Sequence, residues 1–432
     1  MRITRLMTAG MFVAALAAAA DAQTVSLTSK NGTMTLTGKL IELDDEQFHI
    51  RTEFGNMWVA RDLVTCAGTG CPGESGKVGL IIHGSDTMGK DLMPMLVEGY
   101  VDALGTHVAT RSQEGSNTTN LHIKDNAPDG RDVAIVAVQA AGPDAGLTAL
   151  VEDVTDIAMA TRPARAAEVQ AIADQGRGNL SDIGQEYVIA ADAAMPIISP
   201  DVRMDALSLD DLAAIFSGKV TNWSQLGGPN LPILAHTPGL TSGARTIFQE
   251  QVLAPLSTGF SERSKIVPSE KVLADLVATT PGAIGLISAT QPHNARAIDI
   301  LEVCGIRRPA NEFTVKTHEY PLQRRLRLFT DNTDLPDLAR GLLDFTLTPA
   351  ADMLIQDAGF MSLDVQRERA GNATERFTRA VATASGTEQA RLLNTMVEEL
   401  RGARRLSTTF QLSDPTDQPD AIALRDMDRL VS

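Results

Sequence analysis

The chain has 432 residues, 43% of them hydrophobic, and a formal net charge of -16. That length exceeds one ordinary hydrophobic core, so we expect about two to four globular domains. The acidic balance, without a basic tract, excludes the electrostatic footprint of a nucleic-acid-binding protein. A small anion can still bind where backbone N–H groups and hydroxyls are arranged to receive it.

The first 22 residues have the pattern of a cleaved secretory signal peptide. Arg2 and Arg5 supply its charged start, and an apolar run follows from Leu6 to Ala20. Ala20-Asp21-Ala22 is a small-x-small cleavage site, and the apolar run is short for a membrane span. An uncleaved membrane anchor is the alternative. We therefore expect export to the bacterial periplasm and no transmembrane segment later in the chain.

Residues 23–74 are predicted to form a small β module. Apolar and polar residues alternate there with the period of strands, and Asn31-Gly32 is a hairpin turn signal. Cys66 and Cys71 lie five residues apart, which in an exported protein favours a local disulfide. A zinc site would need more ligands nearby, so we expect no metal. The module is either an interaction module or a structural cap.

From residue 75 onward, predicted strands alternate with predicted helices, which indicates an α/β architecture. An apolar strand at 78–82 runs into a polar, glycine-containing turn at 83–89. A second polar turn lies at 114–119, and a buried-looking strand lies at 156–160. Ligands of such sheets bind beyond the carboxyl ends of the strands, so we expect these segments to share one site.

The stretch from Thr241 to Phe248 places two hydroxyl residues and a glycine before an amphipathic run. We predict a helix that begins near Gly243 or Ala244. A helix start leaves about four backbone N–H groups without intrahelical partners and carries partial positive charge, which suits an oxyanion. The alternative is that Thr241 or Ser242 is only an N-cap.

Six segments, in this order, resemble the periplasmic phosphate-binding proteins of ABC transporters and their wider family of two-lobed solute receptors. They are HGSDTM at 83–88, VTDIAMATRP at 154–163, IFSGKVTNWSQLGG at 215–228, SGAR at 242–245, TPGAIGLIS at 280–288 and EYPLQRRLRLFT at 319–330. The resemblance covers roughly residues 78–363, and its specificity lies in the order of the set.

The resemblance implies an α/β, two-lobed periplasmic-binding-protein fold of type II, preceded by the small β module. The two-lobed domain would span residues 75–365. Its first lobe would take about 75–190 and 286–365, and its second about 191–285. Such lobes close on their ligand by a hinge motion.

The resemblance also assigns the ligand site, and every assigned residue offers a hydroxyl, a carboxylate or an open backbone. The ligand-binding residues would be Ser85, Asp86, Thr87, Ser116, Asp156, Thr241, Ser242 and Gly243. Asp156 would be the carboxylate that accepts a proton from phosphate and so rejects a fully ionised sulfate. A turn-capping role is its alternative. We expect Ser85, Asp156 and Ser242 to converge.

Two positions depart from the family pattern. Pro238 stands where the family has an Arg, four residues before Ser242, and Ala244 stands where it has a Thr. Loss of a charge-assisted hydrogen bond costs about 1.5–3 kcal/mol, or roughly ten- to a hundredfold in affinity. The sequence therefore leaves open whether phosphate is bound weakly or a different oxyanion is the ligand.

The tail at 366–432 is charged and contains an amphipathic stretch near residues 390–400. From Leu406 to Val431 it resembles the opening strand and helix of an OmpA-like peptidoglycan-binding domain. The rest of such a domain is missing from the pattern, and no residue here points to wall binding.

Together these patterns predict a periplasmic solute-binding protein that captures phosphate or a related oxyanion for an ABC transporter or a sensor. We expect no cofactor, and no enzyme, because the seven His form no Ser-His-Asp or metal pattern. An ABC transporter permease is the expected partner. The alternative is a cell-envelope interaction protein that kept the receptor fold and lost tight phosphate binding.

Overall fold

The computed structural model describes residues 24–30, 34–43, 47–52, 54–67, 78–127, 130–142, 144–291, 293–303, 305–331, 335–369, 386–400, 402–410, 412–413, 418–419 and 421–431. The predicted signal peptide lies outside these residues. The chain divides into two compact units, Met1–Gly76 and Lys77–Ser432. Among the described residues, every helix is too short or too polar to span a bilayer.

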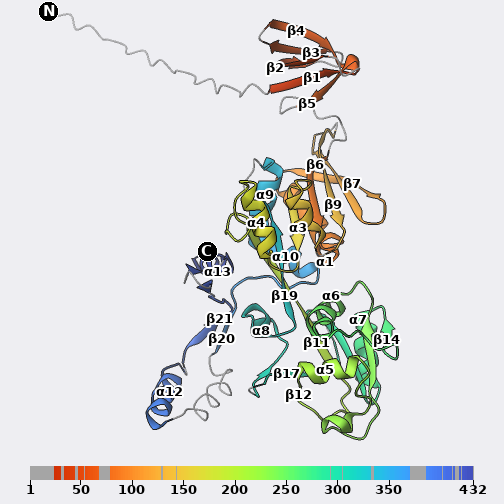
Figure 1. The fold of residues 1–432 in the computed structure, drawn as a ribbon, viewed down its shortest axis with the longest axis vertical. Helices are drawn as coiled ribbons and strands as arrows, with labels where there is room; N and C mark the ends of the chain where they lie inside the picture. The colour runs from red at the N-terminus through yellow and green to blue at the C-terminus, as the bar shows by residue number, and fades with distance from the viewer. Residues whose placement is uncertain are drawn as a thin grey trace, which may run out of the picture. The chain divides into compact units, whose positions relative to one another are not determined.

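The first unit is an antiparallel sheet in the order β4-β3-β2-β1-β5 (Figure 1). Its elements are β1 (Thr24–Ser29), β2 (Thr35–Leu43), β3 (Gln47–Thr52), β4 (Gly55–Ala60), the 3-10 turn η1 (Arg61–Leu63) and β5 (Val64–Ala67). Period-two alternation buries Val25, Leu27, Phe48 and Ile50 in one small core. Cys66 is disulfide-bonded. Cys71 lies outside the described residues, so the Cys66–Cys71 pairing stays a prediction.

The second unit is built on one mixed sheet in the order β14-β13-β15-β11-β19-β10-β6-β9-β8-β7. Its strands are β6 (Val78–Gly84), β7 (Thr106–Glu114), β8 (Thr118–Asp125), β9 (Asp132–Ala140), β10 (Ile157–Ala160), β11 (Glu186–Ile198), β13 (Leu234–Pro238), β14 (Lys265–Val267), β15 (Ala283–Ser288) and β19 (Gln323–Phe329). Four short strands add to the second half: β12 (Ala206–Leu207), β16 (Arg296–Ala297), β17 (Asp299–Leu301) and β18 (Arg307–Arg308).

Helices join these strands. They are α1 (Asp86–Gly89), α2 (Leu92–Ala103), α3 (Ala145–Val151), α4 (Ala166–Asp174), α5 (Leu209–Phe216), α6 (Gly243–Phe248), α7 (Glu270–Thr279), α8 (Glu312–Lys316), α9 (Asp337–Phe345) and α10 (Pro349–Asp357). The sequence marks their starts: Ser208 forms a capping box at α5, and Pro349 follows the Thr348 cap of α10. Short turns η2 (Trp223–Leu226), η3 (Gln249–Leu253) and η4 (Ala254–Leu256) complete the second half.

The two largest of the hydrophobic cores in this unit mark its two lobes. The first lobe buries residues of β6 and α2, including Leu80, Ile82 and Leu96. The second buries Trp223 of η2 and residues of α5 and α6, and it also takes in residues later in the chain, among them Leu322 and Met361. The predicted lobe boundaries near residues 190 and 285 stay a prediction.

Strands β11 and β19 run through both halves of the sheet and join the lobes. Strand β11 pairs with β19, where Asp192 lies opposite Arg324, and also with β15 of the second lobe. In Figure 1 both strands can be followed between the helices around β6 and the helices α5, α6 and α7. The predicted two-lobed α/β fold is confirmed.

The tail returns to the same unit. Its elements are β20 (Arg367–Arg369), α12 (Thr387–Leu400), β21 (Arg404–Leu406), β22 (Leu412–Ser413), β23 (Gln418–Pro419) and α13 (Ala421–Val431). Helix α13 docks on β11, where the Arg429 guanidinium donates to the Val188 carbonyl at 2.9 Å and Arg425 lies 4.5 Å from the Tyr187 ring centre. The OmpA-like resemblance of this tail stays a prediction.

Candidate functional site

The turn after β6 carries the first predicted site residues. Ser85 is 2% exposed, and its N–H donates to the Met159 carbonyl of β10 at 3.0 Å. Gly84 has φ 139, and a Cβ there would collide with the same carbonyl, so only glycine lets the turn lie so close to β10. This contact fixes the start of α1, where Asp86 is exposed and Thr87 is half-buried.

Thr87 meets an ion pair that comes from the two crossing strands. The Arg324 Nη2 donates to the Thr87 hydroxyl at 3.0 Å and to Asp192 Oδ2 at 3.0 Å. The side chains of Arg324 and Asp192 are each 4% exposed. A buried guanidinium and carboxylate are costly unless paired and hydrogen-bonded, and this geometry satisfies both conditions.

The second lobe reaches the same ion pair through the start of α6. A Cβ built on Gly243 would lie 2.6 Å from Asp192 Oδ2 and 3.1 Å from Arg324 Nη2. Only a residue without a side chain lets the start of α6 lie this close to the ion pair without a shift of neighbouring atoms. We call Thr87, Asp192, Arg324 and Gly243 the junction cluster, because it joins both lobes and both crossing strands.

A second, half-buried carboxylate is linked to the start of α6 through Ser242, the neighbour of Gly243. Glu270, the first residue of α7, accepts a hydrogen bond from the Ser242 hydroxyl at 2.6 Å and one from the Ser288 N–H at 2.7 Å. Burial raises the pKa of Glu270, these two hydrogen bonds oppose that effect, and the charge of Asp192 raises the pKa further. The net result is a pKa above the ordinary value.

Residues 95–350, more than half of the chain, match the family model of the PBP superfamily domain. The chain belongs to the PBP superfamily.

Relatives within this superfamily include phosphate-binding proteins. The phosphate-binding protein PstS of Borreliella burgdorferi is 24% identical over 235 residues, which are 53% of this chain and 80% of that protein. PstS of Bacillus subtilis is 25% identical over 246 residues, which are 56% and 76% of the two chains. The crystal structure of a possible phosphate binding protein from Planctomyces limnophilus has 19% identity, a TM-score of 0.51, and covers 72% of this chain and 99% of that one. That structure supports the shared fold.

In this PBP-superfamily chain, Ser242 is the N-cap residue of α6. Its Oγ accepts a hydrogen bond from the Arg245 N–H at 3.3 Å, so it caps α6, which begins at Gly243 as predicted. Its own proton goes to Glu270. The side chain therefore makes the capping contact, while its role in ligand binding stays a prediction, and Thr241 beside it is exposed. Arg245 turns into the second lobe, 4.2 Å from the Phe260 ring centre.

Asp156 does not join Ser85, which corrects the prediction that the two converge. It precedes β10, which runs parallel to β6, and its Oδ2 accepts a hydrogen bond from the Ile81 N–H at 2.7 Å. Ile81 lies four residues before Ser85, or roughly 13 Å along the strand. Asp156 therefore lies at the amino end of its strand, where it accepts a hydrogen bond from the backbone of the neighbouring strand β6.

Ser116 lies at the predicted edge but contacts none of the junction cluster among the described residues. It is exposed in the turn between β7 and β8, and its hydroxyl donates to Asn117 Oδ1 at 2.8 Å. The Asn117 carbonyl accepts from the Ala140 N–H at 2.8 Å, which places this turn beside the carboxyl end of β9.

Three functional candidates escaped the sequence reasoning. Arg162 follows β10 at its carboxyl end and donates to Glu168 at 2.7 and 2.8 Å and to Asp144 at 2.7 Å. A charged residue directly after a predicted strand was the signal that could have marked it. No local signal marks the other two, Asp192 and Arg324, because only the long-range pairing of β11 with β19 brings them together.

Proposed function

We propose that this chain is a periplasmic solute-binding protein that captures phosphate or a related oxyanion at the junction cluster. It would deliver this anion to an ABC transporter or a sensor, and it would bind without catalysing a reaction. The convergence of Thr87, Arg324 and Gly243 from three separate segments is the observation that carries the proposal. The phosphate-binding relatives of this superfamily support the choice of anion.

Arg324 is proposed to supply the positive charge that Pro238 cannot. Its Nη2 holds Thr87 and Asp192, while its Nη1 has no hydrogen-bond partner in the part of the chain that the structure describes. A guanidinium hydrogen bond to an oxyanion is roughly twice as strong as a neutral one. The Thr87 hydroxyl and the N–H groups at the start of α6 would complete the shell around the anion.

Asp192 is proposed to take the selectivity role that was expected of Asp156. Its Oδ2 lies at the junction cluster, where it faces any oxygen that approaches Gly243. A carboxylate accepts a hydrogen bond from a protonated phosphate oxygen and repels a fully ionised sulfate. The negative Asp192 also offsets much of the charge of Arg324, so we expect moderate rather than extreme affinity.

The remaining parts of the proposal concern organisation. We propose a signal peptide at 1–22, a β module at 23–74 closed by Cys66–Cys71, the two-lobed domain at 75–365 and a tail at 366–432. The β module favours a cell-envelope partner, because Phe54 is 79% exposed and Trp58 is 53% exposed. A pulldown of envelope extract with this module should recover a partner, and a Trp58→Ala variant should lose it.

Isothermal titration of the full chain with phosphate, sulfate and molybdate tests the proposed ligand. We expect saturable phosphate binding and none for sulfate. Thr87→Val removes one hydroxyl at nearly constant volume and should weaken phosphate about fivefold. Thr395→Val is the matched control, since its hydroxyl is exposed on α12 and bonds only the Arg391 carbonyl of the same helix. Absence of saturable phosphate binding would contradict the proposal.

A further inference from the structure

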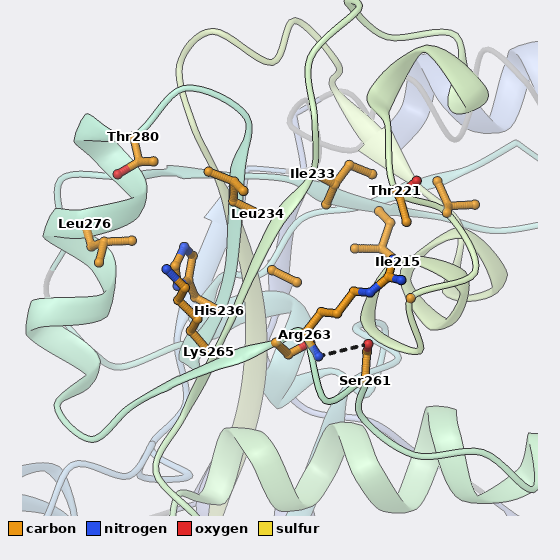
Figure 2. Close-up of a pocket in the computed structure, with 14 residues that line it drawn as sticks. Ile215, Thr221, Ile233, Leu234, His236, Ser261, Arg263, Lys265, Leu276 and Thr280 are labelled. Carbon is orange, nitrogen blue, oxygen red and sulfur yellow. Dashed lines mark hydrogen bonds between the residues drawn. The ribbon is translucent and has the colours of Figure 1, made fainter.

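The second lobe contains a cavity of about 390 Å³ that the proposed function does not use (Figure 2). It lies between α5, β13, the segment before β14, and α7. Its lining residues are Ile215, Gly218, Val220, Thr221, Ile233, Leu234, Ala235, His236, Ser261, Arg263, Ser264, Lys265, Leu276 and Thr280. No residue of the junction cluster lines it. Small-molecule sites have volumes of about 300–1,000 Å³, so this cavity has the size of one.

Two buried polar groups in this cavity lack partners. His236 is 5% exposed, and neither of its ring nitrogens has a hydrogen-bond partner among the described residues. The hydroxyl of Ser264 is buried and also lacks one there. Buried polar groups in folded proteins are nearly always hydrogen-bonded, so unpartnered ones on a cavity wall point to a ligand that supplies the bond.

The same wall carries positive charge. Lys265 of β14 lies opposite His236 in the register of β13 and β14, and Figure 2 shows the two side chains together. Lys265 makes no ion pair within the described part of the chain. Arg263 also lines the cavity, and its side chain extends toward Ile215. An anionic head group would therefore meet one cation beside a buried imidazole and a second cation farther along.

Burial lowers the pKa of His236, and the positive charge of Lys265 lowers it further. The imidazole is therefore neutral at neutral pH, with one N–H donor. The rest of the wall is mostly aliphatic, chiefly Ile233, Leu234 and Leu276, and it also carries the hydroxyl residues Thr221, Ser261 and Thr280. A cation, a neutral donor and an apolar wall together suit an amphipathic anion better than a fully hydrated one such as phosphate.

We propose that this cavity is a second ligand site, which binds a small carboxylate with an apolar body, such as a medium-chain fatty acid. The carboxylate would lie against Lys265 and His236, and the apolar body would lie along Ile233 and Leu276. The site does not depend on anion binding at the junction cluster, and it gives the second lobe a means of sensing a second metabolite.

Titration calorimetry of the full chain with octanoate tests this site. We expect saturable binding of one octanoate, and no binding of octylamine, whose charge is opposite. Lys265→Gln should weaken octanoate at least tenfold. The matched control is Lys271→Gln, which removes an exposed lysine of α7 that does not line the cavity. His236→Phe should abolish binding, because the larger ring occupies the cavity and removes the donor.

Three results would overturn the proposal. One is the absence of octanoate binding up to about 10 mM, where any useful affinity would show. Another is unchanged octanoate affinity in Lys265→Gln, which would mean that only apolar contact is at work. The third is competition between octanoate and inorganic phosphate, or loss of octanoate binding in Thr87→Val, since either would place the ligand at the junction cluster.

Discussion

The two lobes hold their hydrogen-bonded carboxylates in opposite ways. In the first lobe, burial by itself would raise the pKa values of Asp144 and Glu168. The hydrogen bonds and the charge of Arg162 outweigh burial, so both pKa values lie below the ordinary range. In the second lobe, Glu270 is held by the neutral donors Ser242 and Ser288, and its pKa is raised.

This contrast in carboxylate pKa values shows that the two lobes contribute differently to an anion site. Arg162 already pairs with two carboxylates, so its positive charge is neutralised within the first lobe and does not serve an anion. A carboxylate held by neutral donors, as Glu270 is, can change protonation with pH. The positive charge at the junction cluster must then come from Arg324, between the lobes. The following predictions test this contrast.

The largest effect is expected from Gly243→Ala. The added Cβ would lie 2.6 Å from Asp192 Oδ2, so the ion pair or the start of α6 must move. We expect phosphate affinity to fall on the order of 100-fold, or about 2.7 kcal/mol. Gly259→Ala is the matched control, because a Cβ at Gly259 meets nothing within 4 Å. Equal titration curves for the two variants would show that the anion does not bind at Gly243.

Replacing Arg324 by Lys should have the next largest effect. Lysine keeps the charge but lacks the planar fork that holds Thr87 and Asp192 together. We expect phosphate affinity to fall about tenfold, measured by titration calorimetry. Arg391→Lys on the exposed face of α12 is the control. A variant that binds like the parent chain would remove Arg324 from the site.

Glu270→Gln should change how stability depends on pH. The pKa of Glu270 in the folded state is raised above the ordinary value of 4.5. At pH values between 4.5 and that raised pKa, the folded state binds more protons than the unfolded state. Its contribution to the unfolding free energy therefore falls as pH rises above 4.5. Urea unfolding of the Trp58→Phe chain, followed through buried Trp223, should show that Glu270→Gln gains stability relative to its parent as pH rises. A constant difference at all pH values would contradict this.

Glu168→Gln should show the opposite sign and the smallest effect. Its folded pKa is lowered, so its contribution to stability is present above 4.5 and is lost as pH falls below that value. We expect a loss of about 1 kcal/mol or less at neutral pH, because Arg162 and Glu168 are partly solvated. The same Trp223 measurement applies, and a variant that loses stability only in acid would reverse our assignment.

Much of the fold could be predicted because its signals are local. The start of α6 at Gly243 follows from a small, hydroxyl-rich segment before apolar residues at helical spacing. The strand that leads into the 83–89 turn follows from its apolar run. Family motifs then supplied the two lobes. None of these signals reports the partner across a sheet, so the pairing of Asp192 with Arg324, 132 residues apart, stayed hidden.

The error over Asp156 has a physical reason that the sequence itself contained. Asp156 stands before its strand, whereas ligands of parallel sheets bind after the strand ends. Arg162 follows the other end of the same strand, on the side where the site is proposed. Asp156 was predicted to bind the ligand because its carboxylate suits phosphate, although its position before the strand argues against that role.

If the junction cluster binds an oxyanion, a crystal structure of the chain grown with phosphate should show the anion there. We predict a phosphate within hydrogen-bond distance of Arg324 and the Thr87 hydroxyl, against the backbone of Gly243. A phosphate bound beside Asp156, or a junction that stays free of anion at saturating phosphate, would contradict the account.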